Sequence, residues 1–186
     1  MKYSLVRSDR KTLSLCVRDG ELIVRAPRYA SLSDIERFVH SHSDWIEKKM
    51  AVSIAQREEA SKLLPIGKKE LAALYGEARR VIPQRVEYYA PIVGVTYGRV
   101  TIRRQKTRWG SCNAEGDLNF NCLLMLTPRE VLDSVVVHEL CHRKEMNHSK
   151  EFYREVYRVF PEYKKWHVWL RQNGGVLMKR VVADDI

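Results

Sequence analysis

The first part of the chain begins with two segments in which polar and apolar residues alternate. The segments cover residues 12–18 and 21–26, and the dipeptide Asp19-Gly20 between them is typical of a type I′ turn. Alternation with a period of two places one face of each strand against a core. The pattern therefore predicts a β-hairpin that ends at Pro27.

A helical pattern follows the hairpin, and we expect Ser31 or Ser33 to cap it. Its apolar residues recur every three or four positions and would form one buried stripe. They are Ile35, Phe38, Val39, Trp45, Ile46 and Met50. The charged residues 56–62 are interpreted as the exposed end of this helix or as a linker, and residues 65–67, Pro-Ile-Gly, mark a domain boundary.

The middle of the chain predicts a second helix and then a β region. Apolar residues from Leu71 to Ile82 share one helix face, and we expect Pro83 to kink or interrupt the helix before Pro91 stops it. Three short runs then favour strands, separated by turn-forming residues. The strands are expected at residues 95–97, 99–104 and 117–124, with turns at 109–112 and 114–116.

The last third of the chain is helical in its pattern. Thr127, Pro128 and Glu130 form a helix start in which the threonine caps and the glutamate completes a capping box. Ser149 is expected to cap a further helix, and the final helix should end at residues 173–175, Asn-Gly-Gly. Together these elements predict an α+β fold, with an N-terminal β/α part over residues 1–64 and a second domain over residues 65–186.

The strongest chemical signal is the pentapeptide His138-Glu-Leu-Cys-His142 within the predicted helix. Residues four apart on a helix differ by about 40°, so both imidazoles point to one side and can share one Zn²⁺ ion. Glu139 lies near that side without being forced to bind the ion. This is the position of a general base that takes a proton from a zinc-bound water.

A catalytic zinc ion takes a third protein ligand and keeps one open position. His148 can supply this ligand only if the helix ends near residues 144–147, because an unbroken helix would place it on the wrong side. Asn147 suits such a turn, and its side chain is a candidate for holding a ligand histidine in place. We therefore expect one Zn²⁺ per chain on His138, His142 and His148. A structural site is disfavoured because it would be a closed, cysteine-rich cage.

The distribution of charge along the chain indicates a candidate substrate-binding surface. The formal net charge is +10, and residues 88–114 contain no acidic residue. A basic field attracts phosphates, carboxylates or nucleic acid, so residues 99–108 are a possible nucleic-acid contact. The alternatives are a solvated basic surface and, for the tryptophan, a place in the core. The candidate substrate-binding residues are Arg103, Lys106, Arg108 and Trp109.

Other features of the sequence indicate where in the cell the protein is located. Its 186 residues include four cysteines without a Cys-x-x-Cys pair, which favours free thiols in a reducing cytosol. The sequence lacks an apolar run long enough for a membrane span, and its charged N-terminus is unlike a secretion signal. We expect a cytoplasmic protein without a membrane partner. His40, His42 and His167 are interpreted as surface or boundary histidines.

The HELCH motif combines with Arg108-Trp-Gly-Ser-Cys112 and Asn147-His-Ser149, and with these residues the chain resembles the YgjP-like metallopeptidase family. The resemblance extends over nearly the whole chain and is more distant to SprT- and WLM-type proteases. It implies a zincin-like domain with three histidine ligands and Glu139 as the base. Metzincins have glycine where this chain has Glu145, which argues against that group.

Three functions remain open from the sequence. The first is a zinc-dependent peptidase that acts on a peptide or protein. The second is a metal-dependent pyrophosphatase of nucleoside triphosphates such as UTP, an activity that the resemblance also implies. The third is a nucleic-acid-associated protease or binding module that uses the basic residues. The intact HELCH motif favours an enzyme over a binding module.

Overall fold

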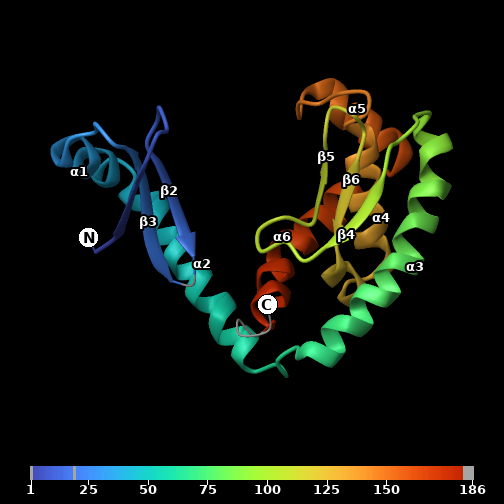
Figure 1. The fold of residues 1–186 in the computed structure, drawn as a ribbon, viewed down its shortest axis with the longest axis horizontal. Helices are drawn as coiled ribbons and strands as arrows, with labels where there is room; N and C mark the ends of the chain where they lie inside the picture. Colours follow the sequence, from blue (N-terminus) through green and yellow to red (C-terminus); the bar gives the residue numbers. More distant parts are fainter. Residues whose placement is uncertain (1, 19, 182–186) are drawn as a thin grey trace. The chain divides into compact units, whose positions relative to one another are not determined.

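A computed structural model describes residues 2–18 and 20–181, and it has the expected α+β architecture (Figure 1). The chain divides into two compact units, Met1–Leu63 and Leu64–Ile186. The sequence placed this division after residue 64, one position later. Each unit has its own hydrophobic core, so each is described by itself.

The first unit is a three-stranded sheet with two helices. Strand β3 is central, β2 pairs with it antiparallel, and β1 pairs with it parallel. The core between sheet and helices includes Val24 and Ala26 from β3 and Ile35 from α1. The elements are β1 Ser4–Ser8, β2 Ser14–Arg18, β3 Glu21–Pro27, α1 Leu32–His40 and α2 Ser43–Ser61.

The predicted hairpin is present as β2 and β3, with Arg18 opposite Glu21. Asp19, the first residue of the expected turn, lies outside the described residues. Gly20 has a φ of 81°, and its N–H donates to Ser53 Oγ on α2 at 3.0 Å. Strand β1 was not predicted, because its run is short and interrupted by Arg7.

The single helix expected from residue 31 to residue 50 is wrong, since α1 ends at His40 and α2 begins at Ser43. The side chains of Ser41 and His42 both donate to the carbonyl of Phe38, at 3.0 and 2.8 Å. Such local bonds compete with helix continuation. Ser31 is the N-cap of α1, and residues 56–61 belong to α2 rather than to a linker.

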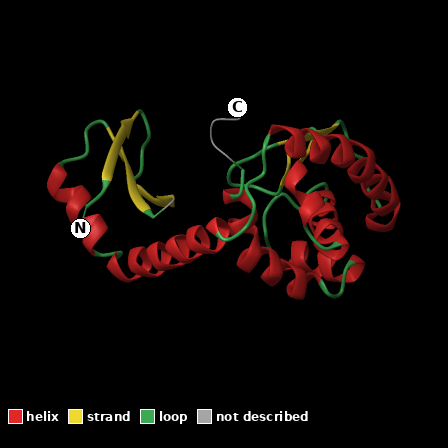
Figure 2. Cartoon of the chain, turned by 90° about the horizontal axis from the view of Figure 1, so that it is seen from below, coloured by secondary structure: helices red, strands yellow, loops and turns green. Residues whose placement is uncertain are grey.

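The second unit is mainly helical, with a small sheet (Figure 2). Helix α4 contacts α3, α5, α6 and β5, so it lies at the centre of the unit. The sheet has the order β4-β6-β5, with β4 parallel and β5 antiparallel to β6. The elements are α3 Lys68–Val93, β4 Val100–Arg103, β5 Gly110–Cys112, β6 Leu118–Asn121, a 3₁₀ helix Cys122–Leu126, α4 Arg129–Cys141, α5 Lys150–Val159 and α6 Tyr163–Lys179.

Helix α3 runs through both Pro83 and Pro91, so the predicted interruption is wrong. Residues Ala78, Ile82 and Val86 on the same helix are fully buried. Burial of this face against the core compensates for the hydrogen bond that an internal proline removes. The helix ends at Val93, where Gly94 has a φ of 81° and its N–H donates to the carbonyl of Ala90.

Three expectations for the β region are wrong. The strand expected at residues 117–124 ends at Asn121, and a 3₁₀ helix follows over Cys122–Leu126. Residues 95–97 form no strand, because the N–H of Val95 is drawn back to the carbonyl of Ala90 in the C-cap of α3. Residues 110–112 form strand β5 rather than a turn, and Ser111 lies opposite Asn119 of β6. The turn at residues 114–116 is present, with Gly116 at a φ of 90°.

The two ends of the helical region also differ from expectation. Thr127 does not cap α4, because its hydroxyl donates to the carbonyls of Leu124 and Pro128, and the N-cap position is occupied by Pro128. Helix α6 continues through Gly174, where an added Cβ would lie 2.9 Å from the ring of Trp109. This glycine allows a close contact with the indole instead of ending the helix. Within the described residues, every helix lacks the combination of length and apolarity that crossing a bilayer requires.

Candidate metal centre

His138 and Glu139 lie on helix α4, and His142 lies at its C-terminal end. Most of this helix is buried. Val131, Val136 and Val137 on this helix are fully buried, and the helix ends at Cys141 with His142 as its C-cap. Polar groups in such surroundings require partners. The two histidine rings have centroids 4.9 Å apart, which fits the predicted i, i+4 placement on one side of the helix.

The chain turns immediately after α4, three residues earlier than the earliest position expected from the sequence. The N–H of Lys144 and that of Glu145 both donate to the carbonyl of Cys141. Arg143 donates to the carbonyls of Thr96 and Ala114, and Lys144 pairs with Glu155 of α5 at 2.9 Å. These contacts on both sides hold the turn in place.

His148 returns to the other two histidines at the end of this turn. Its ring centroid lies 5.0 Å from that of His138 and 4.8 Å from that of His142. Ser149 caps α5 as expected, with its hydroxyl accepting from the N–H of Phe152. Asn147 is exposed, and its carbonyl accepts from the N–H of Ser149. Its backbone thus takes part in the turn, while a role of its side chain in holding a histidine stays a prediction.

The donor set fits a tetrahedral metal ion. One ligand nitrogen from each of the three histidines lies within 4.8 Å of the others, and the Nε2 atoms of His138 and His148 are 3.0 Å apart. Zinc at about 2.0–2.1 Å from each nitrogen separates two tetrahedral ligands by roughly 3.3 Å. The three imidazoles are therefore close enough together to hold one such ion.

Two further groups orient the rings. The Nδ1 atom of His142 lies 3.0 Å from the carbonyl oxygen of Glu145, and the Nδ1 atom of His138 lies 2.8 Å from the hydroxyl of Tyr163. Engaging Nδ1 leaves Nε2 directed toward the third histidine, as is usual for metal-binding histidines. Tyr163 was missed as a site residue, because at the start of its helix it resembles an ordinary core aromatic.

Burial favours the neutral form of the His138 and His142 imidazoles. It lowers the pKa of His138 to about 3, with a further contribution from the charges of His142 and His148. Burial also lowers the pKa of His142, although its bond to the carbonyl of Glu145 opposes the shift. A neutral imidazole has a lone pair available, and metal ligation requires that lone pair.

Glu139 lies against strand β5. A Cβ added to Gly110 would be 2.6 Å from Oε1 of Glu139, so only glycine leaves room for the carboxylate here. Burial raises the pKa of this carboxyl to about 8 in the metal-free protein, and the charge of Arg108 opposes the rise. Gly110 of β5 and helix α4 are therefore in contact through the carboxylate of Glu139.

This contact predicts the effect of a single methyl group. Gly110→Ala should displace the Glu139 carboxylate. Since Glu139 is the general base expected from the sequence, turnover should fall by roughly tenfold or more. The measurement is kcat together with the free energy of unfolding. Gly76→Ala is the matched control, since no atom lies within 4 Å of a Cβ at Gly76 on α3. Equal activity of both variants would contradict a tight glycine–glutamate contact.

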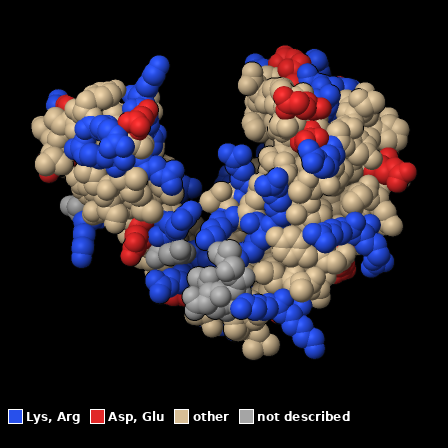
Figure 3. All heavy atoms as spheres, viewed as in Figure 1, with Lys and Arg blue, Asp and Glu red and all other residues tan. Residues whose placement is uncertain are grey.

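The candidate substrate-binding residues lie at the end of β4 and on the segment that leads from it into β5. The side chains of Arg103, Lys106 and Arg108 are exposed, and none forms an ion pair with another described residue. The buried amide of Asn121 donates to the carbonyls of Gln105 and Arg108, which holds the segment in one conformation. Among the charged side chains over the lower half of this unit, Lys and Arg are more frequent than Asp and Glu in Figure 3.

Trp109 is half-buried, packs against the large core and faces Gly174 of α6. This is the arrangement of the core alternative, and a stacking role for its ring stays a prediction. Arg99 differs from the other cations because it pairs with Asp117. Arg99 is therefore not one of the unpaired cations within residues 99–108.

Comparison with models of protein families shows which family this chain matches. The sequence model of the YgjP-like metallopeptidase domain matches residues 11–71 and 66–173, well over half of the chain. The chain belongs to the YgjP-like family. Membership implies a catalytic metal, and the three histidines of this YgjP-like protein are compatible with that requirement.

Two solved structures are similar to part of this YgjP-like chain. The metallopeptidase zymogen abylysin of Pyrococcus abyssi is 25% identical, with a TM-score of 0.45 over 50% of this chain and 94% of abylysin. The metallopeptidase zymogen jannalysin of Methanocaldococcus jannaschii is 21% identical, with a TM-score of 0.44 over 49% of this chain and 94% of jannalysin. A search of curated proteins found no match.

Proposed function

We propose that this YgjP-like protein is a zinc-dependent peptidase in which His138, His142 and His148 hold the ion and Glu139 is the general base. The observation that carries the proposal is the convergence of ligand nitrogens from His138, His142 and His148, with Glu139 adjacent to His138 on α4. Three nitrogen ligands are typical of catalytic zinc, which keeps one position open. When bound, zinc supplies Lewis acidity, which polarises a carbonyl group and makes water more acidic.

The chain's own groups account for proton transfer and substrate placement. Glu139 accepts the proton of the attacking water and delivers it to the leaving amine nitrogen. Strand β5 is at the edge of its sheet and lies directly beside Glu139. A peptide in extended conformation can pair with such an edge, which would place its carbonyl groups near the carboxylate. This support favours a peptide over a nucleotide as substrate.

The metal assignment predicts the result of elemental analysis. Protein purified without added metal should contain about one zinc ion per chain, because the site offers three imidazole ligands. His148→Ala should lose this ion on dialysis, since two ligands hold zinc less tightly than three. His40→Ala is the control, because His40 lies on α1 in the other unit. Equal zinc retention by both variants would show that His148 is not a ligand.

The exposed cations support a second candidate, hydrolysis of nucleoside triphosphates or action on proteins bound to nucleic acid. Arg103, Lys106 and Arg108 form no ion pair with a described residue, and Arg108 lies close enough to influence Glu139. Phosphate groups bind such unpaired cations electrostatically, and salt weakens the contact. The dependence of KM on salt therefore distinguishes a phosphate-containing substrate from a peptide.

We expect the zinc-loaded protein to cleave unfolded protein, with a KM that changes little between low and moderate salt. Arg103→Ala/Arg108→Ala should alter that KM only slightly, because backbone pairing does not depend on these charges. Lys69→Ala/Arg80→Ala on α3 is the control of equal net charge. Turnover of triphosphates alone, with a KM that rises steeply with salt and with the first double substitution, would overturn the peptidase proposal.

A further inference from the structure

The hydroxyl of Tyr163 lies between two histidines. It is 2.8 Å from Nδ1 of His138 and 3.2 Å from Nδ1 of His167. The three rings are stacked, with interplanar angles of 15° between His138 and Tyr163 and 28° between Tyr163 and His167. Tyr163 is only 4% exposed, whereas His167 lies at the surface. A chain of three polar groups therefore leads from the candidate metal centre to the outside.

The position of His167 follows from the helix that carries it. Tyr163 and His167 are four residues apart on α6, so they share one face. The sequence interpreted His167 as a surface histidine without a role. The exposure of His167 agrees with that interpretation, but its Nδ1 atom is hydrogen-bonded to the hydroxyl of Tyr163.

The two ligand histidines on α4 differ in what their Nδ1 atoms face. His142 faces the carbonyl of Glu145, which can only accept, so its Nδ1 must carry the hydrogen. His138 faces a hydroxyl, which can either donate or accept. If the hydroxyl donated to His138, the hydrogen of that imidazole would sit on Nε2, where a metal must bind.

A second acceptor removes this ambiguity. When Nδ1 of His167 accepts the hydroxyl hydrogen of Tyr163, the hydroxyl oxygen is free to accept from Nδ1–H of His138. This arrangement uses the hydroxyl's single hydrogen and one of its lone pairs, so no buried donor is left without a partner. It also leaves the Nε2 lone pair of His138 directed at His148, 3.0 Å away.

We propose that Tyr163 and His167 are positioning residues that hold His138 in the tautomer with a free Nε2 lone pair and thereby strengthen metal binding. The inference rests on the proposed function in taking His138 as a metal ligand. His167 acts through Tyr163, because its ring bonds to the tyrosine hydroxyl. The alternative is that both side chains only pack.

The first measurement uses the metal-free protein. Long-range ¹⁵N–¹H NMR spectra distinguish Nδ1–H from Nε2–H imidazoles, and we expect His138 to be Nδ1–H in the wild type. Tyr163→Phe keeps the buried ring and removes the hydroxyl, so His138 should become a mixture of tautomers. Tyr157→Phe is the control, since that ring contacts Tyr163 edge-on with centroids 6.0 Å apart.

The second measurement is the zinc Kd from competition with a chelator. Tyr163→Phe should weaken binding by about 10- to 100-fold, the usual effect of removing a partner of a ligand histidine. His167→Ala should weaken it less. His167→Asn should restore it, because the amide oxygen of asparagine can take the place of Nδ1 as acceptor. Tyr157→Phe should bind zinc as the wild type does.

The two proposals can fail separately. If Tyr163→Phe and His167→Ala both keep the His138 tautomer and the wild-type zinc Kd, the positioning role is overturned. Equal weakening by His167→Ala and His167→Asn would also contradict it, because then the acceptor is not what matters. A wild type that binds no zinc contradicts the proposed function, whereas the tautomer of the metal-free protein tests the positioning role by itself.

Discussion

Glu139→Gln should keep the fold and the bound metal but lower the hydrolytic rate by at least about 10²-fold, the scale on which loss of a general base acts. Glutamine has nearly the same shape as glutamate, so the contact with Gly110 is preserved. It cannot accept the proton of the attacking water, however. The measurement is kcat on the substrate identified for the wild type, with metal content determined on the same sample.

A matched control separates chemistry from local disturbance. Glu145→Gln changes an acidic residue on the neighbouring turn, whose backbone carbonyl rather than side chain bonds to His142. This variant should retain near wild-type turnover. Full activity of Glu139→Gln would show that another group takes the proton, and loss of metal from it would show that Glu139 also binds the ion.

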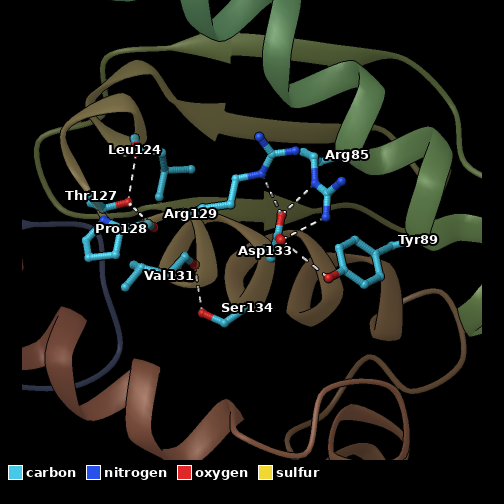
Figure 4. Close-up of polar contacts among 9 residues, drawn as sticks. All are labelled: Arg85, Tyr89, Leu124, Thr127, Pro128, Arg129, Val131, Asp133 and Ser134. Carbon is cyan, nitrogen blue, oxygen red and sulfur yellow. Dashed lines mark hydrogen bonds and ion pairs between the residues drawn. The ribbon is translucent and has the colours of Figure 1, made fainter.

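The second large effect concerns the ion pair that joins α3 to α4 (Figure 4). Asp133 on α4 accepts from Arg85 Nε at 2.7 Å and Nη2 at 2.8 Å, and from the hydroxyl of Tyr89 at 3.4 Å. The two charged side chains are only 8% and 18% exposed. The pair raises the pKa of Arg85 through its hydrogen bond to Asp133, so the guanidinium remains charged.

Asp133→Ala should therefore reduce the free energy of unfolding by about 3–5 kcal/mol, because it leaves a largely buried guanidinium without a carboxylate to balance its charge. Urea unfolding measures this difference. Arg129→Ala is the control, since Arg129 is 59% exposed and lies 4.0 Å from the same carboxylate. Its loss should cost less than about 1 kcal/mol.

Replacing both charged groups provides a further check. Arg85→Met/Asp133→Leu should recover much of the stability lost in Asp133→Ala, since an apolar pair leaves no unpaired charge. A change of under 1 kcal/mol in Asp133→Ala would show that water reaches Arg85. In that case the pair would resemble the exposed contact of Arg129.

The parts of the site that lie close in sequence were predictable. The spacing of His138 and His142 is set by helix geometry alone. The return of His148 required a break in the helix, and Ser149 marked the start of the next one. These features depend on a dozen consecutive residues, so the sequence pattern contains most of the information.

Other parts depend on contacts between distant segments. Tyr163 and His167 meet His138 only because α6 packs against α4, and nothing in their local pattern indicates this contact. Pro83 reads as a helix breaker, yet core burial on neighbouring turns outweighs its cost. Gly110 resembled a turn residue, although its lack of a side chain serves the approach of Glu139.

The length and charge of strand β5 also affect how readily copies of the chain could pair through this sheet edge. A sheet edge with unpaired backbone groups can template pairing between copies of a chain, and long, flat, uncharged edges are prone to aggregation. β5 is three residues long and is preceded by the exposed cations Lys106 and Arg108. Its shortness limits the number of bonds that a second copy could form, and like charges repel that copy. An edge of this kind can remain open to a substrate strand without seeding polymers.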